Sequence, residues 1–313
     1  MAGTIAVTGS TGFVGRHLVR HFAAVGWSVR ALVRREGHLK PSDNINVIYG
    51  SLENAESLRR LVQGADAVVH CAGVIKAASK QEFFSTNERA TGEFAHICAE
   101  SGSCTRFVLI SSIAARLPEI SDYAASKRAG ERRLESLAEK LSCTILRPPI
   151  IYGPGDPESL KLFQLMRRGI ALVPSSLEAR VSMLYIDDLC SAVERAIVSE
   201  GMEGRVLEVH DGAENGYSWQ QVADAAGRYF GRNVRSISIP LAVLWPIALA
   251  NQGIGKLVGS APMLTPGKLR EMYHADWACR DNPLSQATNW KPTVTILEGF
   301  KRSCVWYERE GWF

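Results

Sequence analysis

Three side chains that could handle a proton together, Ser112, Tyr123 and Lys127, lie within the segment SSIAARLPEISDYAASK. Tyr123 and Lys127 are four positions apart in a run whose composition predicts a helix, so both should face the same side. An ammonium beside a phenol favours the phenolate, which would lower a phenol pKa from its usual value of about 10. We therefore predict these three residues as catalytic. Each also has an ordinary alternative role, as a strand-end hydroxyl, a helix aromatic and a solvated charge.

A glycine-rich turn, TGSTGFVG, directly follows the first predicted strand and opens a helix from about Gly12 to Val25. Glycine suits a turn with unusual dihedrals, a backbone that approaches a pyrophosphate and a helix packed tightly on its strand. Backbone N–H groups at the helix start then meet the phosphate charge. This context predicts a dinucleotide site, with a plain tight connection as the alternative. The residues assigned to it are Gly9, Thr11, Gly12, Phe13, Val14 and Gly15.

The end of the second predicted strand, VRALVRRE, indicates which dinucleotide binds. Arg34 and Arg35 occupy the place where an Asp or Glu would accept hydrogen bonds from a ribose 2′-hydroxyl. A guanidinium favours the 2′-phosphate of NADP. We predict NADP with Arg34 as the main contact, and NAD stays open because both arginines could be a solvated strand end.

Hydride chemistry gives the three candidate side chains their roles. While C4 of a nicotinamide exchanges a hydride with a carbon, the attached oxygen must gain or lose a proton. Tyr123 would transfer that proton, and Ser112 would hydrogen-bond the same oxygen. Lys127 would tune the phenol and hold the ribose hydroxyls.

The order of apolar runs predicts the scaffold of this site. Runs such as TIAVTG, SVRALVR, DAVVHCAG and FVLISS alternate with helix-like segments, which is typical of βαβ units and a parallel sheet covered on both faces. We predict a doubly wound α/β Rossmann sheet with a smaller, mostly helical C-terminal substrate domain. The NAD(P)-binding domain is expected at 1–150, with 181–212 returning to it, and the substrate domain at 151–180 and 213–313.

Composition excludes several classes of protein. The seven cysteines are scattered without a C-x-x-C pair or a Cys/His cluster, so we expect neither a metal nor a disulfide framework, and a cytoplasmic location. The net charge of +4 is small, and no basic run alternates with aromatic residues, which argues against nucleic acid. The N-terminal MAGTIAVTGS lacks a charged leader, so we expect a first strand rather than a signal peptide.

One apolar stretch, PLAVLWPIALANQGIGKLVG at 240–259, is interrupted by Pro246 and by polar and glycine residues. Spanning a bilayer takes about 20 nearly unbroken apolar residues, so a transmembrane segment is not expected. We favour a substrate lid or a contact between two copies in a homodimer. A peripheral membrane contact is the remaining alternative.

Together, the motifs TGSTGFVG, HCAG, ISS, YAASK, ILRPPIIYGPGD and LYIDDL resemble the extended short-chain dehydrogenase/reductase family, and they run from residue 8 to about 190. This family contains NAD(P)-dependent epimerases, dehydratases and hydroxysteroid-dehydrogenase-like enzymes. The resemblance implies that Ser112, Tyr123 and Lys127 match the catalytic trio. It further implies cofactor contacts from a set of loop residues, namely Ser51, Leu52, Cys71, Ala72, Gly73, Asn87, Pro148 and Ile150.

Departures from the family pattern narrow the predicted substrate. Tyr123 follows Ser112 by only eleven positions, whereas relatives that act on nucleotide sugars usually carry a longer insertion there. The Thr-Asp-Glu set of the dehydratases is replaced by ISS, Arg180 is one position away from the usual diphosphate-binding arginine, and Ser51 replaces an adenine-binding Asp. We expect an NADP-dependent oxidoreductase that interconverts a secondary alcohol and a carbonyl on a hydrophobic small molecule. A nucleotide-sugar epimerase and a non-catalytic NADP-binding scaffold are the alternatives.

Overall fold

The computed structural model describes residues 3–259, 261–262 and 264–313, without the side chains of Lys256 and Leu257. Within these residues, seven parallel strands form the central sheet in the order β11-β6-β5-β4-β1-β2-β3. The strands are β1 (Thr4–Thr8), β2 (Ser28–Val33), β3 (Ile45–Tyr49), β4 (Ala67–His70), β5 (Arg106–Ile110), β6 (Cys143–Arg147) and β11 (Val206–Glu208). The predicted α/β class with a doubly wound parallel sheet is confirmed.

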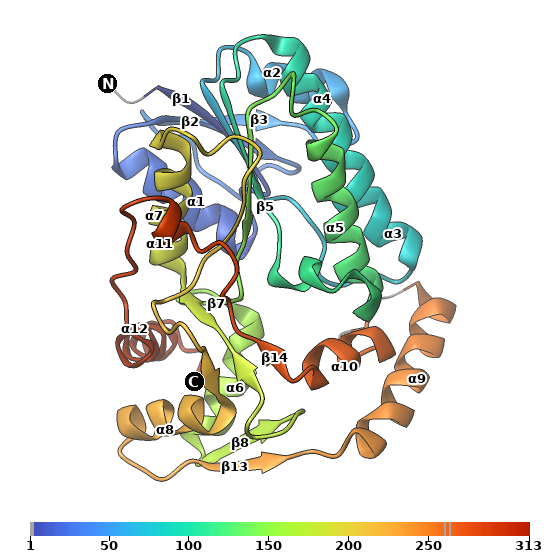
Figure 1. Cartoon of the computed structure of the whole chain (residues 1–313), viewed down its shortest axis with the longest axis vertical. Helices are drawn as coiled ribbons and strands as arrows, with labels where there is room; N and C mark the ends of the chain where they lie inside the picture. The colour runs from blue at the N-terminus through green and yellow to red at the C-terminus, as the bar shows by residue number, and fades with distance from the viewer. Residues whose placement is uncertain (1–2, 260, 263) are drawn as a thin grey trace.

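Helices cover both faces of this sheet (Figure 1). One face carries α1 (Phe13–Ala24) and α7 (Ile186–Val198), and the other carries α2 (Ala55–Val62), α3 (Lys80–Phe84), α4 (Thr91–Ser101) and α5 (Asp122–Glu135). A π-helix at Ser85–Ala90 joins α3 to α4. Because side chains alternate along a strand, β1 serves both cores: Ile5 packs with Leu18 of α1, and Ala6 packs with Phe94 of α4. An apolar core on each face therefore holds the sheet between two layers of helices.

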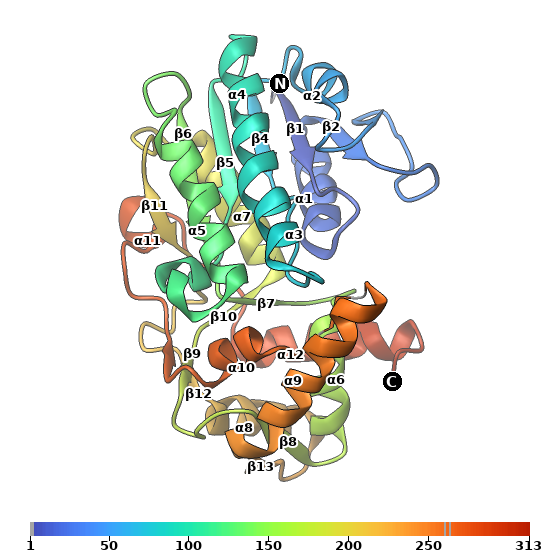
Figure 2. The same cartoon turned by 90° about the vertical axis from the view of Figure 1, so that its right-hand side faces the viewer.

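The remaining elements gather below the carboxyl ends of the strands, as Figure 2 shows from the side. The small sheets there contain β7 (Ile150–Tyr152) with β10 (Met183–Tyr185), β8 (Ile170–Val173) with β13 (Arg235–Ser238), and β9 (Arg180–Val181) with β12 (Tyr217–Ser218) and β14 (Asp276–Trp277). The helices are α6 (Pro157–Arg167), α8 (Trp219–Phe230), α9 (Leu241–Val258), α10 (Pro266–Tyr273) and α12 (Ile296–Arg309). The exception is the short helix α11 (Leu284–Ala287), which lies beside the central sheet, where Pro283 bridges Glu208 of β11.

Only part of the segment 181–212 returns to the central sheet. Its strand β11 pairs with β6 at the edge of the central sheet, and α7 packs on α1. The piece MLYIDD does not join the central sheet, because β10 pairs with β7 in a separate two-stranded sheet. We keep the domain boundaries at 1–150, 151–180 and 213–313 as a proposal.

The apolar stretch at 240–259 is the helix α9, which contains Pro246 near its start. Across the described ranges, no helix has both the length and the apolar character that crossing a bilayer requires.

Candidate active site

The glycine turn between β1 and α1 leaves no room for a side chain at Gly9 or Gly15. Gly9 has a φ of +69°, and a Cβ there would lie 2.7 Å from the backbone nitrogen of Ala72. A Cβ at Gly15 would lie 2.0 Å from the Gly9 carbonyl oxygen, so α1 begins directly on the turn. Gly12 offers α1 no side-chain cap, which leaves N–H groups at the helix start for an anion. This cradle fits a pyrophosphate. The other predicted residues of the segment, Thr11, Phe13 and Val14, lie in the turn or begin α1.

A buried serine that the sequence analysis missed connects this turn to the next strand. Ser10 is fully buried, and its hydroxyl donates a hydrogen bond to the carbonyl oxygen of Leu32, near the end of β2. Arg34 and Arg35 follow directly after β2, and both are exposed. The turn and the two arginines are therefore held at one edge of the sheet.

The loop after β3 brings a further charge to this edge. Ser51 and Leu52 follow β3, and a hydrogen bond from the Ser51 side chain lowers the pKa of the Glu53 carboxyl, helped by the positive charge of Arg34. Arg34 therefore lies close enough to Glu53 to lower the pKa of its carboxyl. Glu53 was not predicted, because nothing in its local sequence distinguishes it from a solvated carboxylate.

The loop after β4 links the glycine turn to the proposed catalytic helix. Cys71 and Ala72 lie against Gly9. A Cβ at Gly73 would lie 2.9 Å from Oδ1 of Asn87 and 3.8 Å from Nζ of Lys127. The loop therefore contacts the predicted phosphate cradle at one end and the predicted lysine at the other.

Asn87, in the π-helix, fastens this loop to α5. Its Oδ1 accepts from the Val74 backbone nitrogen at 2.9 Å, and its Nδ2 donates to the Val74 carbonyl at 2.9 Å and to Oγ of Ser126 at 3.0 Å. Gly130 lets α5 approach closely, since a Cβ there would lie 2.2 Å from the Asn87 carbonyl oxygen. Asn87 thus ties the loop at Val74 to Ser126, the residue before Lys127.

A buried histidine braces the same region from behind. The hydroxyl of Thr91 donates to the Asn87 carbonyl at 3.0 Å, so it accepts from Nε2 of His70 at 3.0 Å. Nδ1 of His70 then accepts from the hydroxyl of Thr8 at 2.7 Å. Burial lowers the pKa of His70 to about 3, so the ring stays neutral and serves as a structural link.

The predicted trio comes together where β5 meets α5. Lys127 is only 8% exposed, and its Nζ donates to the carbonyl oxygen of Ile110, the last residue of β5, at 2.8 Å. Ser112 lies beyond the strand, where its hydroxyl accepts from the Ala114 backbone nitrogen at 3.2 Å and caps a 3₁₀ turn. The Ser112 side chain also lies close enough to the phenol of Tyr123 to act on its pKa.

The electrostatics of the phenol differ from the sequence prediction. Burial raises the pKa of Tyr123 to about 12, and the charge of Glu271 raises it as well, whereas the Ser112 hydrogen bond lowers it. The prediction that Lys127 lowers this pKa is wrong, because burial of the phenol is the main cause of the shift and Lys127 is not among the groups that act on it. Burial also lowers the pKa of Lys127 to about 8. Tyr123 is therefore a neutral phenol at pH 7, the form that can donate a proton.

A buried ion pair supports the segment before Ser112. Glu131 of α5 is fully buried and accepts two hydrogen bonds from Arg147, at 2.8 and 2.6 Å, and one from Ser111 at 2.6 Å. The bidentate geometry satisfies both carboxylate oxygens in a place where water is excluded. It fixes α5 against the ends of β5 and β6.

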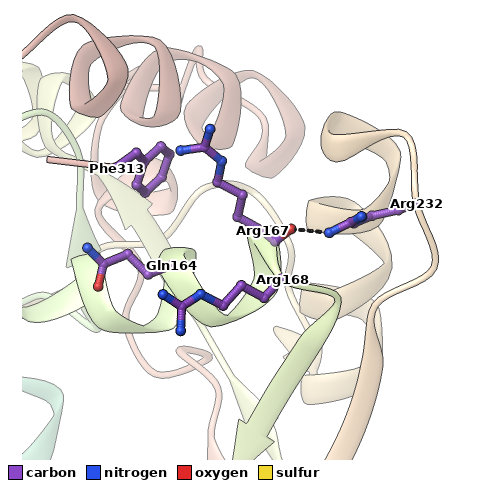
Figure 3. A pocket seen from close by; sticks show the side chains of 5 residues that line it. All are labelled: Gln164, Arg167, Arg168, Arg232 and Phe313. Carbon is purple, nitrogen blue, oxygen red and sulfur yellow. Dashed lines mark hydrogen bonds between the residues drawn. The ribbon is translucent and has the colours of Figure 1, made fainter. Parts of the chain in front are cut away.

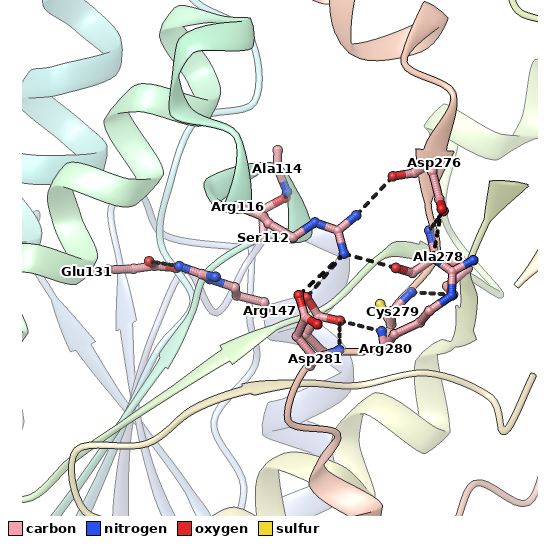
Figure 4. A network of polar contacts seen from close by, with 12 residues as sticks. Ser112, Ala114, Arg116, Glu131, Arg147, Asp276, Ala278, Cys279, Arg280 and Asp281 are labelled. Carbon is pink, nitrogen blue, oxygen red and sulfur yellow. Dashed lines mark hydrogen bonds and ion pairs between the residues drawn. The ribbon is translucent and has the colours of Figure 1, made fainter. Parts of the chain in front are cut away.

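Arg116 connects this segment to the C-terminal part of the chain (Figure 4). Its guanidinium donates to the carbonyl oxygens of Asp276 at 2.9 Å and Ala278 at 3.0 Å, and lies 3.6 Å from the Glu208 carboxylate. Residues about 160 positions apart in the sequence are thus joined beside Ser112, which no local pattern could have indicated.

Glu271 of α10 forms a second link, next to Tyr123. Its carboxylate accepts from the hydroxyl of Ser121, the cap of α5, and from Nζ of Lys268 at 2.9 Å. Arg270 donates to the carbonyl oxygen of Ile120 at 2.8 Å. The start of the proposed catalytic helix is therefore held by α10, and the sequence analysis missed Glu271 because its contact is tertiary.

The last predicted cofactor residues lie after β6. The Pro148 carbonyl accepts from the Ile113 nitrogen at 3.0 Å, which places Pro148 beside the Ser112 turn. Ile150 begins β7 and is 36% exposed. In the described part of the chain, no cluster of three His, Cys, Asp or Glu residues could hold a metal.

A pocket of about 320 Å³ lies away from these residues, lined by Gln164, Arg167, Arg168, Arg232 and Phe313 (Figure 3). None of its residues belongs to the predicted site.

Comparisons with known proteins show which family and which fold the chain resembles. The pattern of the NAD-dependent epimerase/dehydratase family matches residues 5–209. The chain is 36% identical over 312 residues to "Ceramide reductase" from Caulobacter vibrioides, covering 99% of this chain and 96% of that protein. It is 26% identical over 330 residues to UDP-glucose 4-epimerase from Vibrio cholerae, covering 97% and 95%. The solved structure of MoeE5 in complex with UDP-glucose and NAD aligns over 99% of both chains, with a TM-score of 0.76 and 20% identity, which supports the fold alone.

Proposed function

The chain belongs to the NAD-dependent epimerase/dehydratase family, and from this premise we propose that it is an NADPH-dependent reductase of a ketone on a ceramide-type lipid. The observation that carries the proposal is the similarity to the ceramide reductase along nearly the whole of both chains. A reductase of this kind needs a carbonyl as hydride acceptor, so the substrate would be a ceramide with a ketone in place of a hydroxyl.

The glycine cradle, the exposed arginines and the loop 71–73 are suited to hold the cofactor. The N–H groups at the start of α1, after Gly12, would bind the pyrophosphate, and the absence of side chains at Gly9 and Gly15 would keep this turn compact. Arg34 would pair with the 2′-phosphate, which favours NADP over NAD. When bound, the reduced nicotinamide would supply the hydride.

Tyr123 would donate the proton that the carbonyl oxygen needs after hydride arrives at its carbon. One hydride and one proton together convert C=O to CH–OH, and the phenol then recovers its proton from solvent. The raised pKa of about 12 keeps the phenol protonated at neutral pH, which fits the reductive direction. A phenol with a lowered pKa would have suited oxidation better.

Ser112 and Lys127 would assist from either side of the phenol. The Ser112 hydroxyl would hydrogen-bond the substrate oxygen and stabilise its developing charge. Lys127, held by Ile110, would hold the ribose hydroxyls with its ammonium. Asn87 would act by positioning α5 and the loop at Val74.

The proposal includes a cytoplasmic location, which is supported by the seven cysteines, all free thiols.

The test supplies the full chain with NADPH and the ketone form of a ceramide, and follows both NADPH absorbance and the alcohol product. We expect stoichiometric NADPH consumption and no conversion of UDP-glucose to UDP-galactose. Conversion of UDP-glucose by the chain without added nucleotide would instead identify an epimerase and overturn the proposal. Binding of NADPH without any turnover of a ketone panel would favour the scaffold alternative.

A further inference from the structure

Exposed apolar side chains are concentrated in three elements of the lower half of the molecule, β8, β13 and α9. Among the described residues, nine of the sixteen exposed large apolar side chains belong to β8, β13 and α9, with exposed fractions between 38% and 66%. We call this surface the α9 face. Its members are Ile170, Leu172, Ile237, Leu241, Val243, Ile247, Leu249, Ile254 and Val258. Clustering of this kind marks an interaction surface rather than ordinary exposure.

The strands of the α9 face show that the exposure is systematic. In β8, Ala171 and Val173 are buried while Ile170 and Leu172 point outward. Ile237 of β13 lies next to Leu172 in the parallel pairing, so the two strands share an apolar outer side. The face therefore has a buried side that completes the fold and an outer side with no partner in the described chain.

Helix α9 runs along the outside of the molecule, and the chain leaving β13 enters its lower end (Figures 1 and 2). Ala248 is buried and α9 packs against α10. The outward stripe Val243, Ile247 and Ile254 recurs at helical spacing and contains no charged side chain. An exposed helix with such a stripe suits the interface of a lipid layer.

The charges around the α9 face are mostly positive, which favours an anionic partner. The two segments that build it, 159–177 and 225–270, contain nine Lys and Arg and not one Asp or Glu, and of these nine Lys268 pairs with Glu271, directly after the second segment. The rest of the chain carries 27 of the 36 Lys and Arg against all 32 Asp and Glu. Arg167, Arg168, Arg232 and Arg235 are exposed at the ends of β8 and β13. Three of these arginines line the pocket in Figure 3, where Arg232 donates to the Arg167 carbonyl.

From this combination, we propose that the α9 face docks the protein on the surface of an anionic lipid bilayer. Apolar side chains enter the acyl boundary while the surrounding cations meet lipid phosphates. A second copy of the chain fits less well, because a two-fold contact would oppose cationic segments that contain no carboxylate. The proposal is based on the exposed apolar side chains and on the positive charge around them. It does not depend on the proposed reductase function, but it would give such a reductase access to a lipid substrate.

Helix α9 is connected through α10 to the candidate active site. Helix α10, on which α9 packs, holds the start of α5 through Glu271 and Ser121, two residues from Tyr123. A lipid leaving the bilayer beside α9 would therefore arrive next to the proposed proton donor.

The test measures co-sedimentation of the full chain with vesicles, without cofactor or substrate. We expect strong binding to vesicles that contain phosphatidylglycerol, weak binding to phosphatidylcholine alone, and loss of binding as salt rises. Val243→Ser, Ile247→Ser and Ile254→Ser together should weaken binding by more than about tenfold. The matched control, Val198→Ser, Leu297→Ser and Val305→Ser, changes equally exposed side chains elsewhere and should have no effect.

A second pair of variants tests the charges. Arg168→Glu with Arg235→Glu should reduce binding to anionic vesicles by about tenfold or more. Arg59→Glu with Arg132→Glu, two exposed arginines on the upper half, should not. Equal binding to neutral and anionic vesicles, or unchanged binding of both sets of variants, would overturn the proposal. So would a stable dimer that fails to bind vesicles and that the α9 substitutions dissociate. Vesicle binding is measured without turnover, so it is independent of the reductase assay. Binding to vesicles by a chain that does not reduce the ketone would support the docking proposal and refute the proposed reductase function.

Discussion

The sheet half of the molecule and the α9 face differ in the burial of their apolar side chains and in the pairing of their charged side chains. Around the sheet, apolar side chains such as Ile5 and Phe94 are fully buried, and the buried carboxylate of Glu131 is paired with Arg147. On the α9 face, aliphatic side chains are exposed and the nearby cations have no acidic neighbour in their own segments. The sheet half is built to hold a geometry, whereas the α9 face is built to meet something outside the chain.

If the sheet half depends on buried polar pairing, breaking one pair should have the largest effect on stability. Glu131→Gln removes the buried carboxylate that pairs with Arg147, whose side chain is 15% exposed, and with Arg128, and we expect a loss of about 3–5 kcal/mol in the free energy of unfolding. Glu135→Gln, which changes an exposed partner of Arg128 on the same helix, should cost less than about 1 kcal/mol. Urea unfolding of both variants measures the difference, and similar losses would mean that burial of the pair has little importance.

The next largest effect concerns chemistry rather than stability. Tyr123→Phe removes the proposed proton donor, so turnover should fall by about 10²-fold or more while NADPH affinity is kept. Tyr229→Phe in α8 is the matched control and should leave turnover unchanged. Steady-state kinetics with fluorescence titration of NADPH separates the two effects, and full activity of the Tyr123 variant would refute the assignment.

Cofactor preference offers a smaller and more selective effect. Arg34→Ala removes the charge proposed to meet the 2′-phosphate, so the Kd for NADPH should rise about tenfold and the Kd for NADH should barely change. Arg35→Ala should have the weaker effect of the two. Equal losses for both cofactors would indicate damage to the fold rather than a lost phosphate contact.

The smallest effect at neutral pH lies with Lys127. Because burial lowers its pKa to about 8, below the usual value, its ammonium is lost as the pH rises through about 8. We expect kcat/KM to fall over that range. Lys127→Arg keeps its charge throughout, so its activity, although lower, should not show this alkaline decline. The same decline in both proteins would assign it to another group.

Local patterns predicted much of the sheet half. The turn at Gly9, Gly12 and Gly15 and the helix after it were predicted correctly because steric demands on glycine act between near neighbours. Helical spacing likewise placed Tyr123 and Lys127 in α5. The roles of these residues remain predictions.

Longer-range features escaped the sequence analysis. The direction of the Tyr123 pKa was wrong because it depends on burial and on Glu271, which arrives from α10. The links of Arg116 to Asp276 and of Ser121 to Glu271 join residues 160 and 150 positions apart, so no local spacing reveals them. For the stretch at 240–259, the sequence left a substrate lid, a homodimer contact and a peripheral membrane contact open, because the choice depends on how α9 packs against the rest of the fold.

The most direct test of the central claim follows deuterium from C4 of NADPH into the ketone form of a ceramide. The account predicts one deuterium on the new carbinol carbon for each NADPH oxidised, and almost none with Tyr123→Phe under the same conditions. NADPH oxidation that leaves no deuterium on the lipid, or undiminished transfer by the phenylalanine variant, would contradict it.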